Sequence, residues 1–466
     1  MQGRCNAVIL SLLVSLLAVA GLIATPLAHA DKRALVGGTM VDGYVGGPVE
    51  DSVILVRGNT IDAVGTREEL AVPDGYEEID MNGMTVMPGL WEMHAHLMLV
   101  GHTDYDHWHP TYKDRLGDEI MPAAAEQLLL AGVTTARDLG APLEESAQIR
   151  DRIEDGEIAG PRLFVSGPFI QPEPYPDTEH YRWGVDSPEH AREQVARLAE
   201  ADMDVVKLVD QDLMSIEEAQ AVVDEAHAHD MPVVAHSHRP DEIRVGLEIG
   251  VDNFEHTGLT TAPEYPEDII RELRERTATG RVHGAPLYWT PTLEGLWNYP
   301  DIREQPERLE NDCWHRGLEE DTIADIEESI QNPERLEYYQ LHPERKRTIE
   351  RKFQQLRESG VILLIGTDSG IPLKFQCDAT WNELDVWVRV LDVPAMDALR
   401  SATYWPASFM GVEDRWGTLA EGQYADIIAV EGNAVEQIDL LSDVDFVMKD
   451  GTIYKRDGEP VEEKFQ

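Results

Sequence analysis

Residues 85–96 read Thr-Val-Met-Pro-Gly-Leu-Trp-Glu-Met-His-Ala-His, an apolar run that ends in two histidines separated by one alanine. In a β-strand, residues i and i+2 point to the same face, so His94 and His96 present both imidazoles to one side. Neutral imidazole is the commonest protein ligand for zinc and similar ions. Two polar residues at a strand end would give the same pattern, so a metal site needs support from elsewhere in the chain.

Length and charge exclude some classes of protein. The 466 residues suffice for one large domain with an accessory domain, or for two or three domains. With 39 basic and 88 acidic residues, the formal net charge is −49, which excludes nucleic acid as a partner. Lysine is scarce, with nine in the chain. An acidic, lysine-poor surface predicts a halophilic protein whose self-repulsion is screened by salt. A very soluble secreted protein is the alternative.

The N-terminus has the pattern of a targeting segment. Arg4 is followed by an apolar run at residues 8–23 and by Ala-His-Ala at residues 28–30, a small-x-small cleavage site. We predict a signal peptide at residues 1–30, export to the periplasm or the exterior, and no membrane attachment after cleavage. An uncleaved N-terminal anchor is the alternative.

Few cysteines remain after this cleavage. Cys5 leaves with the signal peptide, and the mature chain keeps Cys313 and Cys377. One disulfide is open to this pair in an oxidising compartment, and the sequence does not require it.

Both ends of the mature chain are rich in short strands. Alternating apolar residues punctuated by Gly and Asn occur at residues 34–38, 52–59 and 61–65, and similar segments occur at residues 426–432 and 444–451. We therefore predict one small β-sandwich built from both termini, with residues 31–85 as its N-terminal part and residues 415–466 as its C-terminal part.

The middle of the chain alternates between strands and helices. Besides the strand that ends at His94, the predicted strands are residues 134–137, 162–167, 205–209, 232–236, 253–256, 288–292 and 361–366. Helix signals lie between them, including Pro188 after Ser187 and a capping box from Ser215 to Glu218. Eight strands joined by helices predict an α/β protein with a (β/α)8 TIM barrel over residues 86–414.

Polar residues stand at the C-terminal ends of these strands, where this fold carries its chemistry. Lys207 lies within an apolar strand pattern, where an unpaired ammonium is costly and tends to lose its proton. A neutral amine can react with carbon dioxide to give a carbamate that bridges two metals. Pairing of Lys207 with Asp210 is the alternative. His236, His256 and Asp368 end three further strands, and one metal cluster would satisfy all these groups together.

These residues form an ordered set of motifs. The set comprises Pro88-Gly89-Leu90, His94-x-His96, residues 133–138, Lys207, His236, His256, Gly366-Thr367-Asp368-Ser369 and residues 417–426. It resembles the amidohydrolase superfamily, and within it the imidazolonepropionase/prolidase-like branch of metal-dependent hydrolases. The resemblance covers nearly all of the mature chain. One departure is Glu92, where family members usually carry an aspartate, and little chemical consequence is expected from it.

The resemblance implies a binuclear zinc site. His94, His96 and Asp368 would hold one zinc ion, His236 and His256 the other, and carboxylated Lys207 would bridge them together with a hydroxide. Two metals about 3.5–4 Å apart can share that hydroxide and polarise a substrate carbonyl. Asp368 would carry the proton from the hydroxide to the leaving amine.

Several further residues are candidates for contact with the substrate. His238 could donate to the developing oxyanion, or it is a loop histidine without contacts. Arg239 could bind a substrate carboxylate, although a surface salt bridge is the commoner fate of such an arginine. His102, in the segment after the first barrel strand, and Tyr181, in the Pro-rich segment 168–188, are further candidates, since loops after barrel strands usually set specificity.

We therefore predict an exported hydrolase that acts on an amide C–N bond of a small molecule, such as a dipeptide or an N-acyl amino acid. A mononuclear deaminase or cyclic-amidine hydrolase is one alternative, against which Lys207 argues. A catalytically silent metal-binding barrel is the other, against which the complete ligand set argues. The sequence leaves the metal's identity and assembly into homo-oligomers open.

Overall fold

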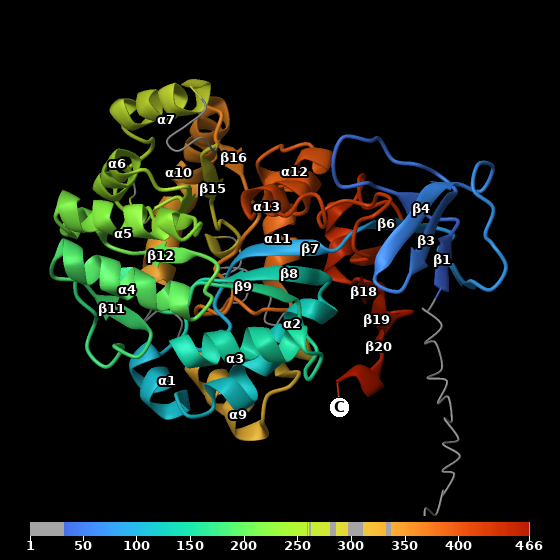
Figure 1. Ribbon diagram of the computed structural model, residues 1–466, viewed down its shortest axis with the longest axis horizontal. Coiled ribbons are helices and arrows are strands. Elements are labelled where there is room, and N and C mark those ends of the chain that lie inside the picture. Colours follow the sequence, from blue (N-terminus) through green and yellow to red (C-terminus); the bar gives the residue numbers. More distant parts are fainter. Residues whose placement is uncertain are drawn as a thin grey trace, which may run out of the picture.

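The computed structural model describes residues 32–258, 260, 262–279, 286–296, 311–331 and 337–465. The predicted signal peptide, residues 1–30, lies outside the described residues. A β-sandwich and a helix-covered barrel lie side by side, and the sandwich combines blue strands from the N-terminal part with red strands from the C-terminal part (Figure 1).

The sandwich contains two sheets. One has the order β4-β3-β1-β5, with β1 (Lys32–Val36), β3 (Ser52–Arg57), β4 (Thr60–Thr66) and β5 (Glu77–Asp80). The other has the order β2-β6-β17-β18-β19-β20, with β2 (Thr39–Met40), β6 (Met84–Pro88), β17 (Ile427–Glu431), β18 (Phe446–Lys449), β19 (Thr452–Arg456) and β20 (Glu459–Pro460). Strands β6 and β17 pair antiparallel, and Leu35, Ile54, Ile427 and Phe446 share one buried cluster. The predicted sandwich from both termini is confirmed.

The barrel contains the eight predicted strands. They are β7 (Leu90–Ala95), β8 (Val133–Asp138), β9 (Arg162–Val165), β12 (Val206–Leu208), β13 (Val233–His236), β14 (Asn253–Glu255), β15 (Tyr288–Thr290) and β16 (Ile362–Leu363). Asp204 N donates to Val165 O at 2.9 Å between β9 and β12. Met93 N donates to Ile365 O at 3.1 Å, which closes the ring between β16 and β7.

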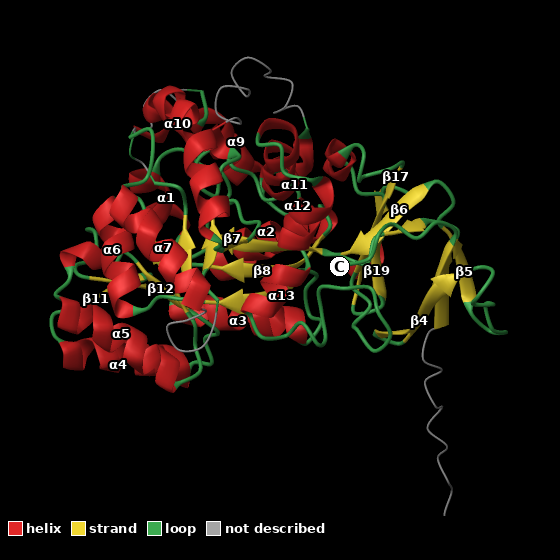
Figure 2. Cartoon of the chain, turned by 90° about the horizontal axis from the view of Figure 1, so that it is seen from above, coloured by secondary structure: helices red, strands yellow, loops and turns green. Residues whose placement is uncertain are grey.

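Helices surround the barrel strands in both views (Figure 2). They are α1 (Tyr105–Tyr112), α2 (Met121–Leu130), α3 (Leu143–Glu154), α4 (Pro188–Glu200), α5 (Ile216–Ala228), α6 (Pro240–Ile249), α7 (Glu267–Thr279), α9 (Glu320–Ser329), α10 (Glu337–Ser359), α11 (Ala379–Asp385), α12 (Ala395–Ser401) and α13 (Tyr404–Phe409). Ser215 and Glu218 form the predicted capping box of α5. Among the described residues, no helix combines the length and apolar character needed to cross a membrane.

The Pro-rich segment 168–188 adds two strands that the sequence did not predict. Strand β10 (Phe169–Gln171) pairs with β12 through Ile170 and Leu208, and β11 (Arg182–Gly184) pairs in parallel with β10. Phe169 and Arg182 are neighbours in this register. The segment is therefore anchored to the edge of the barrel sheet, beside the mouth of the barrel.

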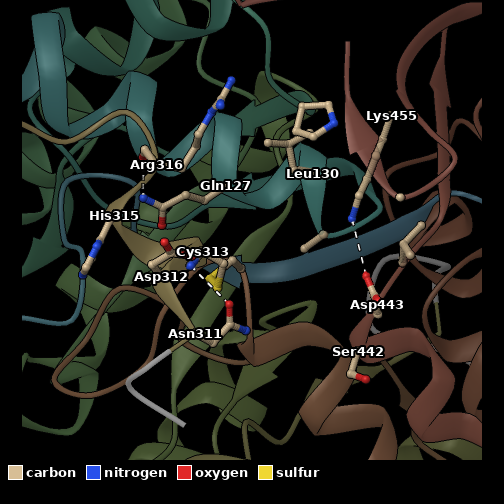
Figure 3. A pocket seen from close by; sticks show the side chains of 15 residues that line it. Gln127, Leu130, Asn311, Asp312, Cys313, His315, Arg316, Ser442, Asp443 and Lys455 are labelled. Atoms are coloured by element: carbon tan, nitrogen blue, oxygen red, sulfur yellow. Dashed lines mark hydrogen bonds and ion pairs between the residues drawn. A yellow bond between two sulfur atoms is a disulfide. The ribbon is translucent and has the colours of Figure 1, made fainter. Parts of the chain in front are cut away.

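Cys313 and Cys377 form a disulfide, with their Cα atoms 6.1 Å apart. The bond borders a cavity of about 550 Å³ between the barrel and the sandwich (Figure 3). Lys455 faces Asp443 at 3.9 Å on the sandwich side of this cavity, and Gln127 lies on the barrel side. The sequence left open whether these cysteines pair, and in the structure they do.

Candidate metal centre

Six polar side chains from five barrel strands converge at the C-terminal end of the barrel. They are His94 on β7, His96 directly after it, Lys207 on β12, His236 on β13, His256 directly after β14, and Asp368 after β16. Asp368 Oδ1 lies 3.0 Å from His96 Nε2 and 3.4 Å from His94 Nε2, and its Oδ2 lies 3.8 Å from His256 Nδ1. The ring of His256 lies 4.7 Å from that of His94 and 4.4 Å from that of His236.

Several nitrogens of this cluster are buried without a hydrogen-bond partner among the described residues. They are Lys207 Nζ, His94 Nε2, His96 Nδ1, His236 Nδ1 and His256 Nε2. Buried polar atoms are normally paired, so such a group of unpaired nitrogens calls for a ligand. Burial lowers the pKa of His94, His236 and His256 well below the ordinary histidine value. The imidazoles are therefore neutral, the form that binds a divalent metal, and the donor set fits such an ion.

His94 is oriented by a buried carboxylate. Glu255 Oε2 accepts a hydrogen bond from His94 Nδ1 at 2.7 Å, which leaves His94 Nε2 facing the cluster. Arg137 Nη2 donates to Glu255 Oε1 at 2.6 Å, and all three side chains are inaccessible to solvent. Metal-binding histidines commonly donate to a carboxylate in this way, which fixes their tautomer. The roles of Glu255 and Arg137 were not predicted from the sequence, although each is a charged residue within a strand of the barrel.

Glu92 connects the two chain segments that carry His94 and Asp368. Its Oε1 accepts from His94 N at 2.9 Å and Thr367 N at 2.8 Å. Its Oε2 accepts from the hydroxyls of Thr367 at 3.0 Å and Thr380 at 2.7 Å. Burial raises the pKa of Glu92 to about 7, against the effect of these hydrogen bonds. Glu92 thus positions the ligands from behind and does not face the cluster.

The backbone is strained at two of the candidate ligands. His256 has φ +72° and Asp368 has φ +68°, in the left-handed region. Such conformations cost on the order of 1–3 kcal/mol each and concentrate at functional sites. Gly366, two residues before Asp368, has no room for a side chain, because a Cβ there would lie 2.5 Å from Thr290 and 2.9 Å from His94 N. The close packing around the strand that leads to Asp368 therefore requires glycine at this position.

Lys207 is enclosed at the centre of the barrel, with 1% of its surface exposed. Burial lowers its pKa to about 8, although the charges of Glu255 and Asp368 oppose this shift. A substantial fraction of this amine is thus neutral near pH 8, as the sequence predicted for a lysine inside an apolar strand.

The cluster opens into a cavity of about 250 Å³. His96, His236, His238 and Asp368 lie in its wall. The other lining residues are aromatic and aliphatic side chains together with Arg182, Arg239 and Asp210. The ring of His238 lies 4.2 Å from that of His236 and 4.6 Å from that of His256, so it is part of the cluster and not a loop histidine without contacts.

The three predicted substrate contacts have different surroundings. Tyr181 lines the cavity, and its hydroxyl lies 2.9 Å from His109 Nε2. Arg239 also lines it, but its guanidinium pairs with Asp210 at 2.8 Å and with Asp212 at 2.6 Å. His102 does not line the cavity, and its Nε2 faces Asp325 at 3.7 Å.

Residues 85–455 match the model of the amidohydrolase family, and the chain belongs to that family. It is therefore a metal-dependent hydrolase that acts on C–N bonds, as predicted.

Individual relatives are distant. The chain is 25% identical to imidazolonepropionase of Deinococcus radiodurans over 448 residues, which covers 88% of this chain and 91% of the relative. It is 23% identical to ochratoxinase of Aspergillus niger over 485 residues, which covers 92% and 88%. The solved structure of an Xaa-Pro dipeptidase with bound methionine shares the fold, with a TM-score of 0.68, 24% identity, and coverage of 91% of this chain and 100% of that one.

Proposed function

We propose that this amidohydrolase is exported and hydrolyses the amide bond of a dipeptide or an N-acyl amino acid, using two divalent ions, with zinc as the expected metal. One observation carries the proposal: six candidate ligands from five strands meet at one place, and five of their nitrogens are buried without a partner among the described residues. The name of one structural relative, an Xaa-Pro dipeptidase, agrees with hydrolysis of a dipeptide.

The ligands divide into two sets. His94, His96 and Asp368 would hold one ion, His236 and His256 would hold the other, and Lys207, if carboxylated on Nζ, would supply oxygens to both. The buried, unpartnered Nζ of Lys207 supports this assignment, because a carbamate has two oxygens to share between the ions. When bound, such a metal pair supplies a hydroxide at neutral pH and polarises the substrate carbonyl.

The chain itself moves the proton and stabilises charge. Asp368 lies in the wall of the cavity and within 3.0–3.8 Å of three imidazoles, so it can take a proton from the nucleophile and deliver it to the leaving amine. Burial lowers the pKa of His238 to about 3, so its ring is neutral and can donate its N–H to the developing oxyanion.

Export has two supports. Residues 1–30 have the pattern of a signal peptide. The Cys313–Cys377 disulfide is of the kind that persists in oxidising compartments such as the periplasm. Edman sequencing or mass spectrometry of the secreted protein should find a mature N-terminus at Asp31, and an intact Met1 in purified protein from the native host would contradict it.

The test of activity is a panel of dipeptides and N-acyl amino acids, incubated with zinc-loaded enzyme and analysed for both cleavage products and ammonia. Cleavage of the amide with release of a free amino acid is expected. Ammonia release without such cleavage would favour a deaminase. Metal uptake without turnover on the whole panel would favour a silent metal-binding barrel.

A further inference from the structure

The cavity beside the metal centre contains two arginines in opposite situations. Arg239 is surrounded by Asp210, Asp212 and Glu242, each within 3.0 Å of its guanidinium. Arg182 has no carboxylate within ion-pair distance among the described residues. The charge of Arg239 is therefore fully compensated within the protein, and that of Arg182 is not.

Arg182 is held in place by neutral groups. Its guanidinium lies 4.8 Å from the ring centre of Phe169, 4.5 Å from that of Tyr175 and 5.2 Å from that of Tyr181. Nη1 donates to Gln171 Oε1 at 2.8 Å, and Nε is buried without a hydrogen-bond partner in the described part of the chain. Aromatic faces stabilise a guanidinium and leave the N–H groups in its plane for an acceptor.

Arg182 lines the same cavity as the candidate metal ligands His96, His236 and Asp368, and its volume of about 250 Å³ suits a short substrate. The ring of Phe169 lies 5.9 Å from that of His96 and 4.8 Å from the guanidinium of Arg182, so one aromatic residue neighbours both. Apolar side chains, including Met98, Val209 and Ile371, also line this cavity.

We propose that Arg182 binds a carboxylate of the substrate, so that this enzyme selects amides whose leaving part is an amino acid with a free carboxylate and an apolar side chain. The inference rests on the proposed hydrolysis of an amide. A planar guanidinium matches a carboxylate with two parallel N–H donors, which a neutral carboxamide cannot replace. In a protein with a net charge of −49, a local cation is also needed to attract an anionic substrate.

The experiment uses zinc-loaded enzyme and two probes, N-acetyl-L-leucine and N-acetyl-L-leucinamide, which differ in the carboxylate. Binding is measured by calorimetry, and hydrolysis is followed by chromatography of the same mixtures. Wild type should prefer the acid, and Arg182→Gln should reduce this preference by about 10- to 100-fold while changing affinity for the leucinamide little. Arg182→Lys keeps the positive charge but lacks the two parallel N–H donors. Its preference for the acid should lie between those of wild type and Arg182→Gln.

Arg197→Gln is the matched control. Arg197 also stacks on an aromatic ring, that of Trp183 at 3.9 Å, but it is exposed on α4 and does not line the cavity. This variant should keep the wild-type preference.

The outcomes separate the two proposals. If neither probe nor the wider panel is hydrolysed but the acid preference disappears in Arg182→Gln, amide hydrolysis is wrong and the carboxylate site stands. Wild type that binds both probes equally or neither, or an Arg182→Gln variant that weakens both alike, overturns the carboxylate site whether or not turnover occurs.

Discussion

Two cavities of this protein differ in how far their buried polar groups are paired within the chain. The cavity at the barrel mouth measures about 250 Å³, and the one beside the disulfide about 550 Å³. His96, His236 and His238 line the smaller cavity, and each keeps a buried nitrogen without a partner among the described residues. At the larger, Lys455 pairs with Asp443, Arg316 pairs with Glu462 at 2.9 Å, and one lining nitrogen, His315 Nε2, is buried without a described partner.

This difference shows that size does not identify the functional cavity. A folded chain satisfies its own buried polar groups unless something else is to bind them. Of the pairs at the disulfide cavity, Arg316 with Glu462 connects the barrel to the C-terminal part of the sandwich. Charges and imidazoles left unpaired at the end of several strands indicate a site whose ligand completes them.

The largest expected effect is at Asp368. Asp368→Asn keeps the shape of the side chain but removes the base, and kcat/KM should fall by about 10²–10⁴-fold. Circular dichroism should show a normal fold. Asp443→Asn makes the same change at the other cavity and should leave kcat/KM within about twofold. A folded, zinc-loaded Asp368→Asn enzyme with near-normal activity would show that Asp368 is not the proton shuttle.

A second large effect is expected at Lys207. Outer partners of metal ligands typically contribute about 10–100-fold to affinity or activity, and a bridging ligand should contribute at least as much. Lys207→Met should therefore lose zinc and activity. Because it removes a buried, unpartnered amine, the metal-free variant should melt at the same temperature as metal-free wild type or higher.

Lys455→Met is the control at the disulfide cavity, and it should keep zinc and turnover. A metal-free Lys207→Met protein that melts well below metal-free wild type would mean that Lys207 is a structural residue.

The disulfide should affect stability and leave chemistry nearly unchanged. It closes a loop of 64 residues, and loss of such a bond typically costs about 2–4 kcal/mol of unfolding free energy. The double variant Cys313→Ser with Cys377→Ser should unfold at lower denaturant concentration, with kcat/KM at 20 °C within about threefold of wild type. A large loss of turnover in a stable double variant would show that the two cavities are coupled.

The barrel and most of the site could be predicted from the sequence because both depend on local patterns. An apolar strand that ends in His or Asp is visible in the chain itself, as at His236 and Asp368. The sequence left Arg239 open between a substrate contact and a salt bridge, because its three carboxylate neighbours come together only in the fold. The strands β10 and β11 were missed because prolines surround them.

The hydrogen bonds that orient the metal ligands also could not be predicted from the sequence. Glu255 and Arg137 lie on β14 and β8, so their contact with each other and with His94 exists only in the closed barrel. Arg182 was not distinguished from other arginines, because its lack of a carboxylate partner is a property of the folded cavity.

The smallest expected effect is that of salt on the stability of the whole chain, and it should not depend on either cavity. With a net charge of −49, self-repulsion is strong at 0.01 M ionic strength, where the Debye length is roughly 30 Å, and weak at 1 M, where it is roughly 3 Å. The melting temperature should therefore rise through a sodium chloride series over this range. A midpoint that is unchanged or lower at molar salt would remove the case for halophilic adaptation.

Metal stoichiometry tests the central claim most directly. Wild-type protein saturated with zinc and bicarbonate, freed of excess metal and measured by elemental analysis, should contain two zinc ions per chain. Five candidate ligands and a bridging lysine exceed what one tetrahedral ion uses. A reproducible content of one ion per chain under these conditions would contradict the binuclear centre.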